Sequence, residues 1–134
     1  MRKFSSGFGV PLNEASRKAM APLLAATRAN APVDEGALKR SLAIKRARSS
    51  KLKPVHLVGP RADYQRGGDR PVRYAHIVEW GRAGNADGKG GMPGTRFMTR
   101  AFEATSATVL EILERELPAA IERRIAKIAA RTKR

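Results

Sequence analysis

Apolar residues recur at helical spacing near both ends of the chain. From Leu12 to Asn30 they return every three or four positions, which predicts one amphipathic helix. Pro22 lies inside this run, and an interior proline removes a backbone hydrogen bond, so we expect a kink near Ala21 rather than two separate helices. The N-terminal helix is therefore predicted to be long but bent.

The C-terminal run with helical spacing starts at Phe97 and continues toward the chain end. Thr95 or Thr99 is the expected N-cap, because a threonine hydroxyl accepts hydrogen bonds from free N–H groups of the first turn. Pro118 interrupts the pattern, and we expect it to kink the helix or to restart it. The pattern predicts a long C-terminal helix.

Alternation with a period of two predicts strands between these helices. Residues 41–49 and 53–60 alternate, and the short link Ser49-Ser50-Lys51 favours a hairpin between them. Residues 72–81, "VRYAHIVEWG", have the strongest alternation and carry apolar groups on both faces, which predicts a central strand. Two helices around such strands indicate an α+β fold, in which a small antiparallel sheet is packed by the N-terminal and C-terminal helices.

Three segments lack apolar periodicity. Residues 1–11 contain glycines, serines and a proline and are predicted to be a flexible arm. Residues 82–95 hold five glycines and are predicted to be a flexible, glycine-rich loop. Residues 130–134 form a basic tail. A chain of 134 residues fits one domain, so we expect residues 1–134 to form a single domain.

The net charge of +15 at pH 7 indicates a negatively charged partner, since such a chain attracts nucleic acid or acidic protein surfaces. Residues 36–62 carry eight basic side chains and no acidic one. The alternative is a solvated strand edge whose charges prevent aggregation. The candidates for contact with DNA or an acidic partner are Lys39, Arg40, Lys45, Arg46, Arg48, Lys51 and Lys53.

The sequence gives no support to catalysis, a cofactor or a metal site. There is no cysteine, and the two histidines, His56 and His76, are expected in the middle of strands without a ligand pattern around them. The glycine-rich loop fails as a phosphate loop, because Gly90 stands where a serine or threonine must follow Gly88-Lys89. No apolar run is long enough for a membrane span or a signal peptide, so we expect synthesis in the cytoplasm.

Three stretches, in this order, resemble a family of tailed-bacteriophage neck and tail-completion proteins. "APVDEGALKRSL" is similar to the signature that follows the family's first helix, "YAHIVEWG" to its Tyr-Ala-x-x-Val-Glu-(aromatic)-Gly strand, and "GTRFMTRAFEA" to the start of its last helix. Two positions depart from the family's pattern: Arg96 precedes Phe97 where the family often has proline, and Arg100 lies where many members have another residue.

The resemblance implies a minor tail component or head–tail joining protein, structural and not enzymatic. Such a protein forms a homo-oligomeric ring, commonly a hexamer, between the head connector or stopper and the tail tube or terminator of a siphovirus-like particle. It is located in the virion after synthesis in the bacterial cytoplasm, with no membrane and only weak, non-specific contact with DNA. A tail terminator is the alternative within the family, and a small basic nucleic-acid-binding protein is the alternative outside it.

A ring needs two different surfaces on each subunit, and we expect the glycine-rich loop to supply one of them. Trp80 is interpreted as either a core residue or an interface anchor, with the core favoured, and Tyr74 is expected in the core. The predicted interface residues are Trp80, Arg82, Gly84, Asp87, Lys89, Gly91 and Arg96.

Overall fold

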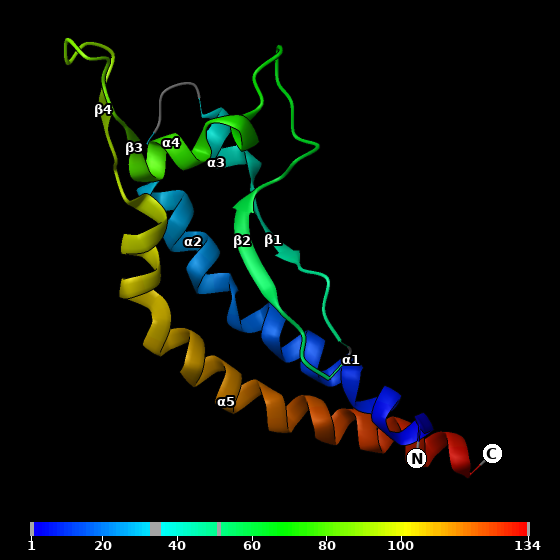
Figure 1. Ribbon diagram of the computed structural model, residues 1–134. Coiled ribbons are helices and arrows are strands. Elements are labelled where there is room, and N and C mark those ends of the chain that lie inside the picture. The colour runs from blue at the N-terminus through cyan, green and yellow to red at the C-terminus, as the bar shows by residue number, and fades with distance from the viewer. Residues whose placement is uncertain (1, 33–35, 51, 134) are drawn as a thin grey trace. The chain divides into compact units, whose positions relative to one another are not determined.

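The computed structural model describes residues 2–32, 36–50 and 52–133 (Figure 1). The chain groups into two compact units, and each is described by itself. The first unit contains residues 1–22, 44–57 and 106–134, and the second contains residues 23–43 and 58–105. The strands of the β1–β2 pair and the last helix each contribute residues to both units. That the whole chain folds as a single domain stays a prediction.

Three segments make up the first unit. They are helix α1 (Arg2–Ala19), the end of the hairpin formed by strands β1 (Leu42–Arg46) and β2 (His56–Pro60), and the part of helix α5 (Phe97–Thr132) from residue 106 onward. Ala15 and Ala19 of α1 are buried, and their small side chains allow neighbouring segments to approach the helix closely. On one side of α1, the Ser16 hydroxyl lies 2.8 Å from Nδ1 of His56 and ties the hairpin to the helix.

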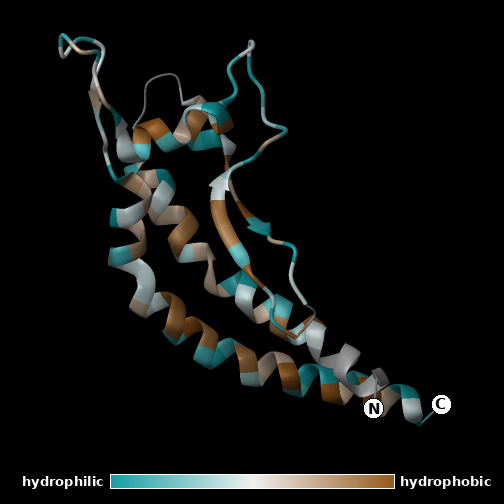
Figure 2. Cartoon of the chain, in the orientation of Figure 1, coloured by the Kyte–Doolittle hydropathy of each residue, from teal (hydrophilic) through white to brown (hydrophobic). Residues whose placement is uncertain are grey.

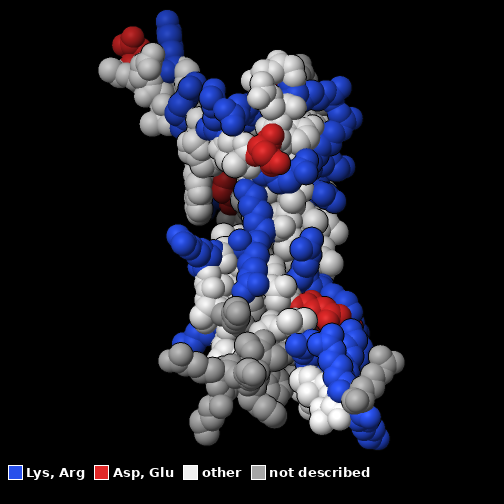
Figure 3. Space-filling model, turned by 90° about the vertical axis from the view of Figure 1, so that its right-hand side faces the viewer, with Lys and Arg blue, Asp and Glu red and all other residues white. Residues whose placement is uncertain are grey.

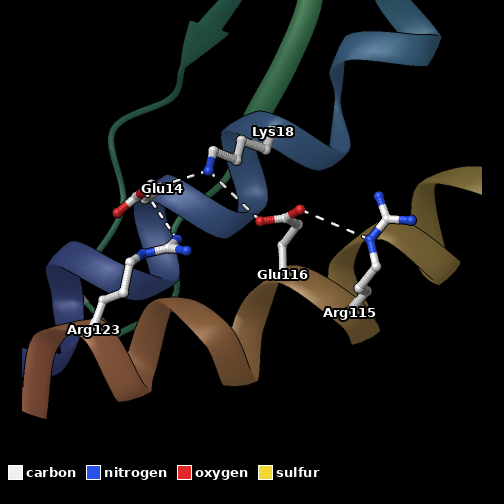
Figure 4. A network of polar contacts seen from close by, with 5 residues as sticks. All are labelled: Glu14, Lys18, Arg115, Glu116 and Arg123. Atoms are coloured by element: carbon white, nitrogen blue, oxygen red, sulfur yellow. Dashed lines mark hydrogen bonds and ion pairs between the residues drawn. The ribbon is translucent and has the colours of Figure 1, made fainter.

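Charged side chains tie the other side of α1 to α5 (Figure 4). Arg123 donates a hydrogen bond of 3.2 Å to Glu14, and Lys18 forms ion pairs of 3.6 Å with both Glu14 and Glu116. Residues two apart on a helix point in nearly opposite directions, and Ser16 lies two positions from both Glu14 and Lys18. The hairpin and α5 therefore pack on opposite sides of α1.

The second unit collects short elements around one apolar core. They are most of α2 (Ala21–Asn30), α3 (Ala37–Ser41), the 3₁₀ helix η1 (Pro71–Arg73), α4 (Ala75–Trp80), β3 (Gly81–Arg82), β4 (Met92–Pro93) and the first turns of α5. Partly buried side chains, including Tyr74 and Val78, pack against this core. The buried residues of the core are Ala31, Leu38, Leu42, Ala75 and Phe97.

Glu79 connects α4 to the beginning of α5. Its carboxylate is buried and accepts hydrogen bonds from the backbone N–H groups of Met98 (2.8 Å) and Thr99 (3.0 Å), and from the Thr99 hydroxyl. The first N–H groups of a helix have no partner within the helix, and the positive end of the helix dipole favours a negative charge there. Glu79 thus caps α5 from a residue about 20 positions earlier in the chain.

The predicted N-cap, Thr95 or Thr99, is therefore wrong. The Thr95 hydroxyl donates to the carbonyl oxygen of Val78 instead (2.9 Å), and the Thr99 hydroxyl donates to the cap rather than providing it. The N-cap was predicted from residues next to the start of the helix, whereas the observed cap comes from a segment about 20 residues earlier. A carboxylate makes stronger hydrogen bonds to backbone N–H groups than a neutral hydroxyl does.

Two predictions for the N-terminal half are also corrected. Residues 1–11 were expected to be an irregular arm, but α1 begins at Arg2 and continues through Pro11. Pro11 is buried and lines a small hollow together with Ala120 of α5, so burial outweighs the low helix propensity of proline and glycine. The predicted kink near Ala21 is a break at Met20 between two helices, which places Pro22 in the first turn of α2.

The predicted central strand, residues 72–81, is wrong as well, because this segment forms η1 and α4. Its buried residues, Pro71, Ala75 and Glu79, are four positions apart, which is helical spacing. Apolar groups occur at so many positions of this short run that the period of a helix and the period of a strand both fit it. His76 consequently lies on a helix and is exposed, not in the middle of a strand.

The remaining elements follow the sequence pattern more closely. The hairpin of β1 and β2 is confirmed, although Lys51 of its link lies outside the described residues. Pro118 was expected to kink the helix or to restart it. The restart is wrong, because α5 runs through Pro118 as one helix, and the kink stays a prediction. The α+β class is confirmed, with a small antiparallel sheet and helices at both ends of the sequence.

Replacement of the capping carboxylate tests its importance. Glu79→Ala is expected to lower the free energy of unfolding by about 2–3 kcal/mol, because it leaves the N–H groups of Met98 and Thr99 without their acceptor. Chemical denaturation measures the loss. Glu103→Ala, which removes an exposed carboxylate from the same helix, should change the free energy by less than about 0.5 kcal/mol. Equal losses for both variants would contradict the capping role.

Candidate assembly interface

Trp80, the last residue of α4, is at the surface. Its side chain is 61% exposed, and the guanidinium of Arg96 lies 4.3 Å from the ring centroid, which is a cation–π contact. The core interpretation of Trp80 is therefore wrong. Glu79 takes the buried position, and its neighbour on a helix points about 100° away, so the tryptophan faces outward. Tyr74 is half-buried and packs against the core.

Two glycines allow the chain to pass close to itself beside Trp80. A Cβ at Gly81, whose φ is 83°, would lie 2.5 Å from the carbonyl oxygen of Met92, and a Cβ at Gly94 would lie 2.5 Å from the carbonyl oxygen of Glu79. Both distances are shorter than van der Waals contact allows. The contact between α4, β3 and β4 therefore requires glycine at both positions.

The two ends of the loop of residues 82–95 pair as short strands, which the sequence did not predict. β3 and β4 pair antiparallel, with Gly81 opposite Pro93 and Arg82 opposite Met92. The Arg82 guanidinium donates two hydrogen bonds, of 2.8 and 3.2 Å, to the carbonyl oxygen of Gly90. Arg82 is thus engaged inside the loop. Whether the loop is flexible stays a prediction.

The structure gathers most of the predicted interface residues around this loop. Gly84 and Gly91 approach each other across it, whereas Asp87 and Lys89 are exposed toward its end. Trp80 and Arg96 lie together at its base through their ring contact. Their role in assembly stays a prediction, but all seven are exposed and belong to the second unit.

An open groove of about 710 Å³ lies beside the base of this loop. Its lining is mostly apolar, with Asp69, Arg82 and Thr95 as the main polar members. Tyr74 donates a hydrogen bond of 3.0 Å to Asp69, which keeps this part of the lining in place. The apolar side chains come from α3, α4 and β4 and are Ala37, Leu38, Ile77, Val78, Met92 and Pro93.

The basic candidates are divided between the two units. Lys39 and Arg40 are exposed on α3 in the second unit. In the first unit Arg46, Arg48 and Lys53 are exposed at the hairpin end, and Lys45 is half-buried. Lys51 lies outside the described residues. Figure 3, which shows the right-hand side of the view in Figure 1, shows many Lys and Arg side chains and few acidic ones.

His56, on β2 of the hairpin, contacts the Ser16 side chain of α1. Burial lowers the pKa of His56 below its usual value, and the positive charges of Arg46 and Arg17 lower it further. Among the described residues no group of three or more potential ligands could hold a metal ion. Within the same residues no helix is both long enough and apolar enough to cross a membrane.

The lowered pKa of His56 predicts how stability depends on pH. The unfolded chain takes up a proton at about pH 6.5, whereas the folded chain does so only at lower pH, so stability falls as the pH drops below about 6.5. Between about pH 7.5 and 5.5 the free energy of unfolding should decrease more for the wild type than for His56→Gln. His76→Gln, which replaces an exposed histidine, is the control and should behave like the wild type. An unchanged slope in His56→Gln would refute this assignment.

Comparison with known proteins gives one match. The family model described as "Bacteriophage HK97-gp10, putative tail-component" matches residues 1–81, more than half of the chain. The matched part runs from the start of α1 to the glycine that follows α4. No curated protein and no solved structure matches the chain.

Proposed function

The chain belongs to the HK97-gp10-like family of bacteriophage tail components, and from this premise we propose that it is a non-catalytic ring subunit at the neck of the particle. The ring, a hexamer in this proposal, joins the head connector or stopper to the tail tube. Completing the tail as its terminator is the alternative position within the same family. The family match over residues 1–81 carries the proposal.

The arrangement of the first unit supports a ring. Subunits of a ring meet head to tail, so each must offer two different surfaces that face away from each other. α1 has the hairpin on one side and α5 on the other, and the polar contacts of Ser16 and Glu14 hold both in place. The exposed loop around Trp80 and Arg96 supplies a further surface for a neighbouring virion protein.

A second candidate function, binding of nucleic acid, is favoured by the hairpin. Arg46, Arg48 and Lys53 are exposed there, in a segment without acidic residues. In a neck protein DNA moves through a channel, and a channel must not hold DNA tightly. The two functions therefore differ in the strength of DNA binding at physiological salt.

Deletion of the gene tests the neck position. Electron microscopy of particles from the deletion strain is expected to show full heads beside separate tails, because the joint between them is missing. Complementation with the wild-type gene is the control and should restore joined particles. Overlong or frayed tails would move the protein to the terminator position, and normal joined particles would refute the proposal.

Titration of DNA binding against salt separates the two functions. We expect weak binding at low salt that disappears near physiological salt, with a log–log slope of several units. Arg48→Ala/Lys53→Ala should reduce that slope by about two, since each lost phosphate contact removes about 0.9. Nanomolar binding that persists at physiological salt would favour the nucleic-acid-binding function.

A further inference from the structure

One stretch of α5 has the opposite charge to the rest of the chain. Residues 106–122 contain four glutamates and one arginine, a net charge of −3 at pH 7. Because the whole chain carries +15, all other residues together carry +18. This acidic stretch belongs entirely to the first unit.

Most of these glutamates lie on the outer side of the helix. Glu116 faces α1, where it pairs with Lys18. The others are exposed, and no described residue forms an ion pair with them. Spacings of three, four, eight and eleven place them on one face of α5 with two apolar side chains, Leu110 and Ile125, that are 58% and 54% exposed. We call this the acidic face; its members are Leu110, Glu111, Glu114, Glu122 and Ile125.

The hairpin end has the complementary properties. Side chains alternate along a strand, and His56 points to Ser16 of α1, so Val55 and Leu57 point away from the helix. They are 44% and 52% exposed. Figure 2 shows hydrophobic residues on β2 and along α5. We call this the hairpin surface; its members are Arg46, Arg48, Lys53, Val55 and Leu57, all of them exposed.

The two surfaces cannot meet within one unit. The hairpin packs on the Ser16 side of α1, and α5 packs on the Glu14 side, with its acidic face turned away from α1. A contact between surfaces on opposite sides of a subunit is head to tail and repeats from copy to copy. This geometry suits a ring or a row of identical subunits.

We propose that the acidic face of one copy binds the hairpin surface of the next copy. The proposal rests on the proposed ring and identifies the contact that closes it. Val55 and Leu57 are buried against Leu110 and Ile125, while the arginines and Lys53 around them face the glutamates of the neighbour. The partner is a second copy, because the two surfaces carry opposite charges and every copy of the chain has both. A polyanion such as DNA satisfies the hairpin surface but is repelled by the acidic face.

Exchanging the charges tests this contact. One variant carries Glu111→Lys/Glu114→Lys on the acidic face, and the other carries Arg48→Glu/Lys53→Glu on the hairpin surface. Each changes one surface to the sign of its partner, so each variant alone is expected to associate at least about tenfold more weakly than the wild type. An equal mixture should recover association, because each variant then offers a matched pair to the other. Asp63→Lys, an exposed loop position outside both surfaces, is the control.

Sedimentation velocity across protein concentrations, at low and at physiological salt, measures association, and circular dichroism checks that each variant is folded. Recovery in the mixture supports the contact, and a variant that fails to fold cannot produce it. Association of both single-surface variants at wild-type strength overturns the contact and leaves the ring intact. Failure of folded variants to recover in the mixture overturns it as well. A wild-type chain that stays monomeric under all conditions also overturns it, and the neck function is then judged by the deletion strain alone.

Discussion

The second unit depends on the hydrogen bonds that the carboxylate of Glu79 accepts from the start of α5. This carboxylate is buried at the end of α4 and meets the free N–H groups at the beginning of α5, so it sets where the long helix starts and in which direction it leaves. A buried carboxylate without partners would cost several kcal/mol, so the cap and the helix start require each other. The exposure of Trp80 follows directly, because the residue next to a buried one on a helix turns outward.

In the first unit a single helix, α1, holds the neighbouring segments in place. α1 has small buried residues, Ala15 and Ala19, where other segments come close, and polar residues on two sides that hold different neighbours. Ser16 contacts the hairpin, and Glu14 contacts α5. Exposed ion pairs contribute little stability by themselves, so these contacts mainly select which face of each partner is turned inward. The faces turned outward are the ones available to other molecules.

The sequence predicted those parts of the fold in which one period was clear over enough residues. The hairpin of β1 and β2 and the long C-terminal helix were found in this way. Residues 72–81 were not, because a run of ten residues with apolar groups at most positions fits a strand and a helix equally well. The start of α1 was missed because Pro11 and nearby glycines oppose a helix locally and only burial favours it. The role of Glu79 was missed because nothing in the neighbouring sequence shows a cap that acts over about 20 residues.

The net charge of +15 favours nucleic acid or an acidic protein surface as a partner, but a single net value is a poor guide to partners. A charge of +15 averages over a surface that is strongly basic at the hairpin and acidic on the outer side of α5. A protein that only binds DNA gains nothing from an exposed row of glutamates, which repels the phosphates. A subunit that must meet its own copies needs both signs, on separate surfaces, with exposed apolar side chains between the charges. The separation of charge along this chain, more than its total, therefore agrees with the family of structural tail components to which it belongs.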